Sequence, residues 1–198
     1  MKNKILIVVD YQYDFASPEG ALYVPGAETI VDSIQEKIND TSFKDIIYTL
    51  DTHDNEEYIS SEESKLFPIH CEFNSFGWDL FKIQTRNRET KLILEEGIFE
   101  SAKDFSVKNE FVFMKDKFSI WEGNSNYEKF FIERYDKDTE IVIVGVATNY
   151  CVFWNAMGYR ERGYKNVKIM SDSVKGIYDD TYEKNIEIMK NKNIKFEG

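Results

Sequence analysis

The sequence predicts an α/β fold: a three-layer sandwich in which helices cover both faces of a central, mainly parallel sheet. Short apolar runs rich in β-branched residues, which are typical of buried strands, alternate with segments whose apolar residues have helical spacing. Such alternation favours parallel strands joined by helical crossovers. The 198 residues, of which 42% are hydrophobic, are enough for one sizeable core. We therefore expect a single domain over residues 1–198.

The first half of the chain supplies two strands, one helix and a long polar segment. Residues 4–9 form a continuous apolar run, which indicates a central strand. A Pro-Gly breaker precedes residues 27–39, where isoleucines recur every fourth residue and predict a helix. Residues 45–50 predict a second strand. Residues 52–79 are long, polar and irregular and contain both histidines of the chain, which favours a functional loop.

The second half predicts the remaining elements by the same criteria. Residues 91–97 and 100–107 have weak patterns and receive no assignment. The other segments show either apolar runs or helical spacing. We expect strands at 111–114, 141–146 and 167–170, a short edge strand at 194–196, and helices at 127–135, 150–162 and 180–191.

Four chemically active side chains follow predicted strands directly. Asp10, Asp51, Lys115 and Cys151 each stand at the carboxyl end of a strand or just after it. In a parallel sheet these ends meet at one edge, where ligands bind. The sequence therefore predicts that the four residues converge, although they are far apart along the chain.

Cys151 lies where a predicted strand turns sharply into a helix. On the first turn of that helix, unpaired N–H groups and the positive end of the helix dipole would stabilise a thiolate. The same N–H groups could stabilise an oxyanion. These features favour a nucleophile, and the alternative is a buried structural cysteine.

A thiol needs a base or a neighbouring cation to react as a nucleophile at neutral pH. Asp10 is the candidate base and Lys115 the candidate cation at the predicted sheet edge. Taken singly, Asp10 could instead cap the turn after its strand, and Lys115 could be a solvated charge at a strand end.

A second cluster has the composition of a metal site. Asp51 and His53 are separated by one residue, and Glu62 and His70 follow on the same polar segment. Imidazole and carboxylate together suit Zn²⁺, Mn²⁺ or Fe²⁺ better than Ca²⁺. Several other acids stand near Glu62, so the choice among them stays open, and the alternative for the whole segment is a solvated acidic loop.

Composition excludes several classes of partner. The net charge of -11 argues against binding to nucleic acid or an anionic membrane surface. No apolar run approaches the length of a membrane span, and the run near the amino terminus is too short for a signal peptide. Two cysteines make no disulfide framework in a chain of this length. We expect a cytoplasmic protein, with a homo-oligomer left open.

The motifs resemble those of the isochorismatase-like cysteine hydrolase superfamily, and within it the nicotinamidases, over essentially the whole chain. The resemblance implies a Cys–Asp–Lys triad of Cys151, Asp10 and Lys115. Lys117 is a nearby competitor, but Phe118-Ser119 follow Lys115 at the family's spacing. The matching segments are VVDYQYDF (8–15), TLDTH (49–53), FPIHC (67–71) with Gly77-Trp78 after it, KDKFSIW (115–121) and GVATNYCV (145–152).

The resemblance also implies the rest of the site. A non-proline cis peptide is expected between Val146 and Ala147, and the N–H groups of Ala147 and Cys151 are expected to form an oxyanion hole. A divalent ion, most simply zinc, with Mn or Fe as alternatives, is expected to bind the pyridine nitrogen of the substrate. The implied ligands are Asp51, His53 and His70, with Glu62 where many members have a third histidine. The implied substrate walls are Phe15, which would stack on the ring, and Trp78 or Phe118.

The implied activity is hydrolysis of nicotinamide through a thioester. Alternatives are another small-amide hydrolase of the superfamily and, outside catalysis, a redox-sensing protein; isochorismatase itself does not need the nucleophilic Cys151. Two positions depart from the pattern or have no assignment. Asn149 stands where the family often has Asp, which removes one charge from the pocket rim, and the bulk of Trp154 has no assigned role.

Overall fold

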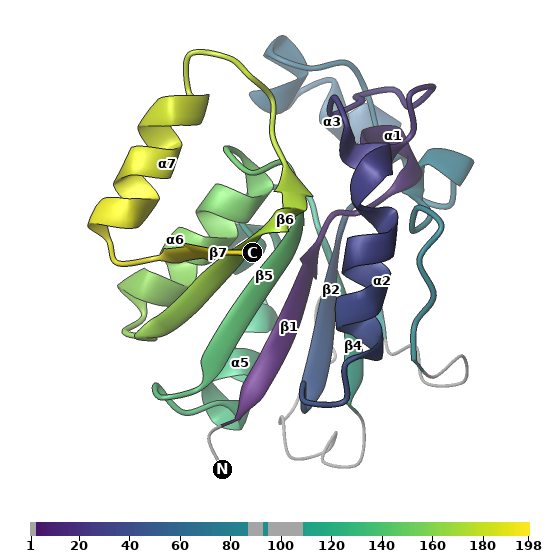
Figure 1. Ribbon diagram of the computed structural model, residues 1–198. Coiled ribbons are helices and arrows are strands. Elements are labelled where there is room, and N and C mark those ends of the chain that lie inside the picture. Colours follow the sequence, from purple (N-terminus) through teal and green to yellow (C-terminus); the bar gives the residue numbers. More distant parts are fainter. Residues whose placement is uncertain (1–2, 87–92, 95–108) are drawn as a thin grey trace.

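The computed structural model describes residues 3–86, 93–94 and 109–198 (Figure 1). Within these residues seven parallel strands form one sheet in the order β3-β4-β2-β1-β5-β6-β7. The expected three-layer α/β fold is confirmed. The strands are β1 (Lys4–Val9), β2 (Asp45–Asp51), β3 (Ile93–Leu94), β4 (Glu110–Lys115), β5 (Glu140–Val146), β6 (Asn166–Lys175) and β7 (Lys195–Glu197).

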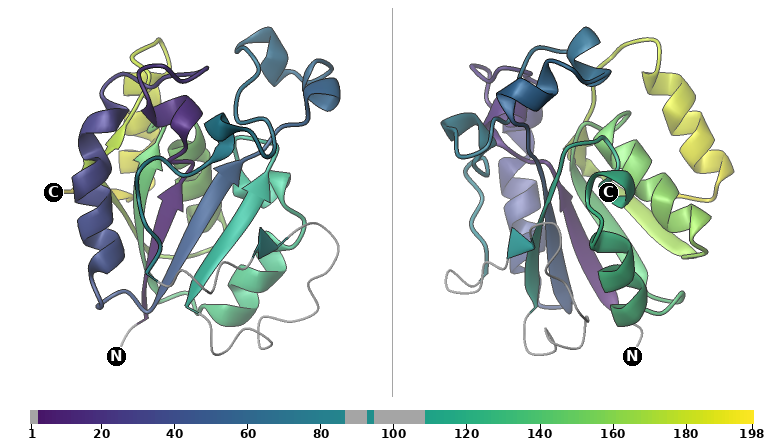
Figure 2. Two further views of the ribbon diagram at one scale, coloured as in Figure 1. Left: turned by 90° about the vertical axis from the view of Figure 1, so that its right-hand side faces the viewer. Right: turned by 180° about the vertical axis from the view of Figure 1, so that it is seen from behind.

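Helices cover both faces of the sheet (Figures 1 and 2). Ile5 and Ile7 of β1 belong to a core that includes side chains of α4 to α7, whereas Leu6 and Val8 belong to a second core with side chains of α2. The alternation along β1 shows why a central strand needs apolar residues at every position. The helices are α1 (Tyr13–Ala16), α2 (Val31–Asn39), α3 (Asn55–Tyr58), α4 (Ile120–Gly123), α5 (Tyr127–Arg134), α6 (Cys151–Glu161) and α7 (Tyr182–Asn191), with 3₁₀ turns η1 (Ala27–Ile30), η2 (Glu63–Lys65) and η3 (Phe76–Trp78).

The largest difference from the expected elements is the length of β6. It continues to Lys175 instead of ending near residue 170, and its register against β5 shifts between Ile143 and Gly145. The extension passes through the polar stretch Ser171–Ser173, which conceals it from apolar patterning. Helices α1, α3 and α4 have four residues each, too short to produce a helical period. Apart from β3, the segments 91–97 and 100–107 lie outside the described residues.

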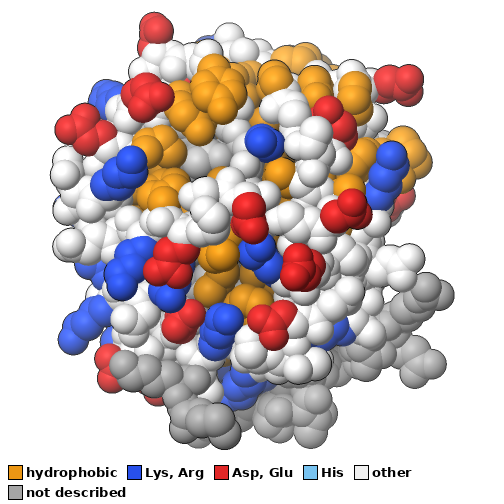
Figure 3. Space-filling model, viewed as in Figure 1, with side chains coloured by type: hydrophobic (Ala, Val, Ile, Leu, Met, Phe, Trp, Pro, Cys, Tyr) orange, Lys and Arg blue, Asp and Glu red, His pale blue; other side chains and the backbone are white. Residues whose placement is uncertain are grey.

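The surface carries mixed charge on the face shown in Figure 3, where acidic and basic side chains are interspersed and apolar side chains gather along the upper part. Among the described residues, no helix combines the length and apolar character needed to span a membrane.

Candidate active site

Three of the predicted residues meet beyond the ends of β1, β4 and β5. Asp10 follows β1 with a positive φ of 45°, is fully buried, and accepts a hydrogen bond of 2.6 Å from the Thr49 hydroxyl. Nζ of Lys115 lies 2.8 Å from Oδ2 of Asp10 and 2.7 Å from Oδ1 of Asp51. The same nitrogen lies 3.6 Å from Sγ of Cys151. The structure therefore brings the predicted nucleophile, base and cation into one contact network.

Burial dominates the electrostatics of this network. It raises the pKa of the Cys151 thiol well above its usual range, although the Lys115 ammonium acts to lower it. Burial also raises the pKa of Asp10, again against the effect of Lys115. Burial alone would lower the pKa of Lys115, but Asp10 and Asp51 hold it well above its usual value. The charged form of the lysine is thus favoured, the proton affinity of Asp10 is increased, and the neutral form of the thiol is favoured.

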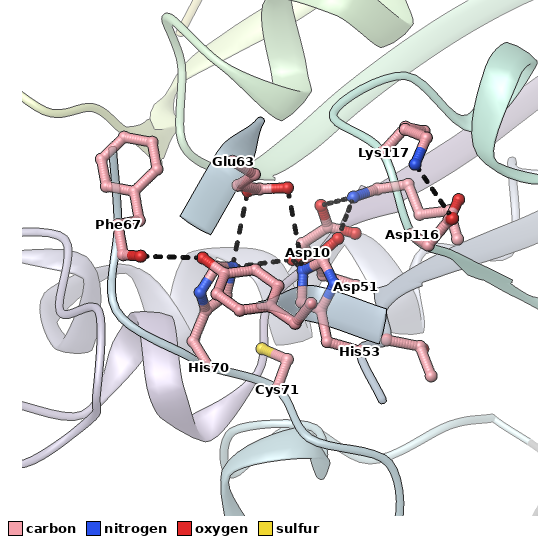
Figure 4. Close-up of polar contacts among 12 residues, drawn as sticks. Asp10, Asp51, His53, Glu63, Phe67, His70, Cys71, Asp116 and Lys117 are labelled. Atoms are coloured by element: carbon pink, nitrogen blue, oxygen red, sulfur yellow. Dashed lines mark hydrogen bonds and ion pairs between the residues drawn. The ribbon is translucent and has the colours of Figure 1, made fainter. Parts of the chain in front are cut away.

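Lys117 does not compete for this position. Its side chain is 53% exposed and its Nζ lies 3.1 Å from Oδ2 of the neighbouring Asp116. Figure 4 shows this pair to one side of the Asp10 and Asp51 cluster. Lys115, not Lys117, contacts Asp10 and Cys151.

The turn before Cys151 has an unusual backbone. The Val146–Ala147 peptide is cis, as expected, and α6 begins at Cys151. Gly145 has a φ of 111°, and a Cβ there would lie 2.0 Å from the carbonyl oxygen of Val9, so only glycine fits. The amide N–H groups of Ala147 and Cys151 donate to no acceptor that the structure places among the described residues. Two N–H donors are therefore available next to the thiol.

A metal-ligand cluster lies on the other side of Lys115. The ligand atoms of Asp51, His53, Glu63 and His70 all lie within 4.8 Å of one another. Nε2 of His53 and Nε2 of His70 each lie 3.0 Å from Oδ2 of Asp51. The Glu63 carboxylate lies 3.9 Å from Nε2 of His53 and 3.7 Å from Nε2 of His70, and faces both rings in Figure 4.

Glu62 does not belong to this cluster. Its side chain is 89% exposed and pairs with Lys65, whereas the side chain of Glu63 is only 10% exposed. Glu63 is the first residue of the 3₁₀ turn η2, and consecutive side chains on a tight turn point in different directions. The expectation of Glu62 is therefore corrected to its neighbour; the sequence offers several acids here and no period that separates them.

The donor set fits a cation. Nδ1 of His70 lies 2.8 Å from the Pro68 carbonyl oxygen, which only accepts, so Nδ1 carries the ring proton and donates it. In the neutral ring Nε2 then carries a lone pair, and this lone pair faces Asp51 Oδ2. Two acceptor atoms so close together attract a cation, either a metal ion or the proton whose affinity Asp51 increases by raising the pKa of His70. Two imidazoles and two carboxylates suit Zn²⁺, Mn²⁺ or Fe²⁺, and the Pro68 carbonyl supplies the outer contact that orients His70.

A small cavity of about 20 Å³ is lined by Cys151 and by Asp51, Glu63 and His70 of the candidate metal-ligand cluster. Two of the three predicted walls, Phe15 and Phe118, line it. Trp78 does not: its indole N–H donates to the Thr52 hydroxyl at 2.8 Å and its ring packs against Phe73. Other lining residues that sequence reasoning missed are Leu22, Val24, Phe67, Tyr150 and Ile177.

Gln12 is a further residue that sequence reasoning missed, although it lies in the VVDYQYDF segment. Its buried side chain accepts a hydrogen bond from the Asp51 N–H and donates to the Asp51 and Trp78 carbonyls, at 2.8, 2.9 and 2.9 Å. It thereby fixes the backbone of Asp51, a member of the candidate metal-ligand cluster.

Comparison with known proteins places this geometry in a family. A model of the isochorismatase domain matches residues 4–196. The nicotinamidase of Saccharomyces cerevisiae is 30% identical over 205 residues, which covers 89% of this chain and 90% of that protein. The structure of the pyrazinamidase of Pyrococcus horikoshii in complex with zinc has a TM-score of 0.73 at 28% identity and covers 98% of both chains. The structure of the yeast nicotinamidase bound to the inhibitor nicotinaldehyde has a TM-score of 0.69 at 25% identity, over 98% of this chain and 99% of that one. Since the family match extends over nearly the whole sequence, the chain belongs to the isochorismatase domain family.

Proposed function

We propose that the protein is a nicotinamidase, which hydrolyses nicotinamide to nicotinate and ammonia through a thioester on Cys151. The observation that carries this proposal is that Cys151, which lies beside Lys115 and Asp10, shares one cavity with Asp51, Glu63 and His70 of the candidate metal-ligand cluster. A thiol next to a base can attack a carboxamide. A metal ion held by the ligand cluster at the far wall would bind a ring nitrogen. The similarity to nicotinamidases and to a zinc-bound pyrazinamidase supports the same assignment.

The first half of the reaction forms the thioester. Asp10 takes the Cys151 proton, and the thiolate attacks the carboxamide carbon. The Ala147 and Cys151 N–H groups donate hydrogen bonds to the resulting oxyanion. When this intermediate collapses, the C–N bond breaks and Asp10 returns the proton to the departing ammonia. Lys115 stays protonated and balances the negative charge throughout.

The second half releases the acid. Asp10, again a carboxylate, takes a proton from a water molecule that attacks the thioester carbon. The same two N–H groups stabilise the second oxyanion. Cleavage of the C–S bond then yields nicotinate, and the thiol of Cys151 recovers its proton.

Asp51, His53, Glu63 and His70 would hold one divalent ion, with zinc favoured and Mn or Fe as alternatives. When bound, such an ion supplies a Lewis acid that binds the pyridine nitrogen and orients the ring. Phe15 and Phe118 provide apolar ring contacts. Phe67, Phe118 and Tyr150 contact one another around the small cavity, so they must separate when a ring enters. We place the reaction in the cytoplasm.

Ammonia release from nicotinamide tests this function. Purified wild-type protein, Cys151→Ala and the matched control Cys71→Ala are assayed, with metal content measured on the same samples. Cys71 is buried and lies outside the pocket lining, so its variant is expected to retain activity.

The expected result is ammonia from the wild type and Cys71→Ala only, with about one metal ion per chain in all three. Turnover by Cys151→Ala would refute the thioester mechanism. A metal-loaded wild type that releases ammonia from other small amides but not from nicotinamide would reject the substrate.

A further inference from the structure

The side chain of Asn149 joins the nucleophile turn to the segment that follows β6. Asn149 lies two residues before Cys151 and is only 1% exposed. Its Oδ1 accepts a hydrogen bond of 3.0 Å from the Ile177 N–H, and its Nδ2 donates to Asp179 Oδ1 at 3.2 Å and to Thr181 Oγ1 at 2.8 Å. Asn149 is therefore not among the residues that line the cavity, and its side chain contacts Ile177, Asp179 and Thr181 instead.

These contacts fix which way the amide faces. The Ile177 N–H can only donate, so it requires the oxygen of Asn149. The NH₂ group is then left for Asp179, whose carboxylate can only accept. An aspartate at position 149 would still accept the hydrogen bond from the Ile177 N–H. It would lose the NH₂ group that donates to Asp179 and Thr181.

Asp179 links the same network to the substrate cavity. Its Oδ2 accepts a hydrogen bond of 2.6 Å from the Tyr150 hydroxyl, and the Tyr150 ring lines the cavity. Ile177, held by Asn149, lines it as well. Burial acts to raise the pKa of Asp179, but hydrogen bonds from Thr181 and Tyr150 hold it below its usual value, so the group is a carboxylate at neutral pH.

The backbone of the turn is held from the same side. The Asn149 carbonyl accepts a hydrogen bond of 2.8 Å from the Asn185 side chain of α7, and the Thr148 N–H donates to the Lys175 carbonyl at 2.9 Å. Among these contacts, the pairing of the Asn149 amide with the Asp179 carboxylate can be tested by exchanging the two side chains.

We propose that Asn149 is a positioning residue whose amide, paired with the Asp179 carboxylate, holds both the nucleophile turn and the Tyr150 wall of the pocket. Asp179 favours an amide at position 149, because a carboxylate there would face a second carboxylate with only the shared Thr181 hydroxyl as a donor between them. The inference rests on the proposed function, in which Cys151 is the nucleophile and the cavity beside Tyr150 binds the substrate. The atoms that act are those of Asn149 and Asp179, which touch neither substrate nor metal ligand.

An exchange of the two side chains tests the pairing. Asn149→Asp is expected to lower kcat for nicotinamide on the order of 10- to 100-fold, since small displacements of a nucleophile have effects of that size. In Asp179→Asn, on the exposed side, the amide oxygen can still accept from Asn149 and Thr181, and the NH₂ group replaces the oxygen that accepts from the Tyr150 hydroxyl, so the variant is expected to lower kcat roughly three- to tenfold and to raise KM through Tyr150. The double variant Asn149→Asp/Asp179→Asn restores an amide donor facing a carboxylate acceptor, at the cost of the oxygen that accepts from the Thr181 N–H, and is expected to recover part of the kcat lost by Asn149→Asp.

The rate of Cys151 alkylation by iodoacetamide gives a readout that does not depend on substrate. Peptide mass spectrometry separates Cys151 from Cys71. The same order is expected: slow in Asn149→Asp, partly restored in the double variant. If the wild type does not hydrolyse nicotinamide, the proposed function fails while this series still tests the pairing.

Asp180→Asn is the matched control, since Asp180 is exposed and makes no hydrogen bond or ion pair that the structure places among the described residues. It is expected to match the wild type in every assay. If Asn149→Asp does not fold, Asp179→Asn against Asp180→Asn carries the test alone. Wild-type kcat and alkylation in Asn149→Asp, a double variant no better than Asn149→Asp, or equal effects of Asp179→Asn and Asp180→Asn would overturn the proposal.

Discussion

Lys115 is a single buried cation among buried acids. Its ammonium contacts Asp10 and Asp51. The Glu63 carboxylate lies near the rings of His53 and His70, which both also contact Asp51. The site thus sets three carboxyl groups against one ammonium in a buried environment. Burial raises the pKa of Glu63 and the Asp51 carboxylate raises it further, and these effects outweigh the lowering by Lys115 and the two histidines. A divalent ion would neutralise the set, so Glu63 has more reason to ligate than any exposed neighbour.

Glu63→Gln should therefore weaken metal binding by more than about tenfold, because it removes a charged ligand at a site that discriminates by charge. Glu62→Gln is the matched control one residue earlier, and its exposed side chain predicts an unchanged affinity. Competition with a chromophoric chelator gives both affinities. Equal values for the two variants would remove Glu63 from the ligand set.

Between elements, the Gln12 side chain joins the segment after β1 to the end of β2 and to the η3 turn. It pairs with both the N–H and the carbonyl of Asp51 and also with the Trp78 carbonyl. Gln35 makes a similar two-way contact with the N–H and carbonyl of Gln84, but at a partly exposed position on α2. The two glutamines differ mainly in burial and in what they hold.

Gln12→Ala should lower the free energy of unfolding by about 2–4 kcal/mol, because it leaves buried backbone groups without partners. Gln35→Ala should cost less than about 1 kcal/mol, because water can replace its bonds. Urea denaturation of both variants measures the difference. Similar losses at the two positions would show that the Gln12 contacts do not depend on burial for their effect.

Strand positions and the sheet edge were predictable from the sequence because each rests on a local apolar run followed by one polar residue. The acid that joins the candidate metal-ligand cluster was not predictable, since the choice between Glu62 and Glu63 depends on how the η2 turn points two adjacent side chains. Trp78 was misplaced for the same kind of reason: its indole finds a hydrogen-bond partner in Thr52, outside the cavity. The role of Asn149 depends on Asp179, 30 residues away, which no local pattern connects to it.

At the scale of the whole molecule, the order of the strands in the sheet decides which reactive side chains lie next to one another. The order β4-β2-β1-β5 sets Lys115 beside Asp51, and the Asp10 and Cys151 positions follow on the next two strands. Asp51 therefore belongs both to the ion-pair network around Lys115 and to the candidate metal-ligand cluster. The cluster also joins the end of β2 to Glu63 and His70 on the polar segment 52–79, so a bound ion would cross-link the sheet to its least regular part.

Metal binding should accordingly raise the melting temperature of the protein. An ion that binds only the folded state, at 100 times its Kd, stabilises by about 2.7 kcal/mol. For a chain of this size that corresponds to a shift of roughly 5–10 °C. Differential scanning calorimetry of chelator-treated and reloaded protein measures the shift, with His70→Ala as the variant that should lose it and Glu62→Gln as the one that should keep it. An equal metal-induced shift in wild type and His70→Ala would place the stabilising ion elsewhere. A shift present in the wild type and Glu62→Gln but absent in His70→Ala would mean that the segment carrying the ligands is anchored to the sheet by the ion itself.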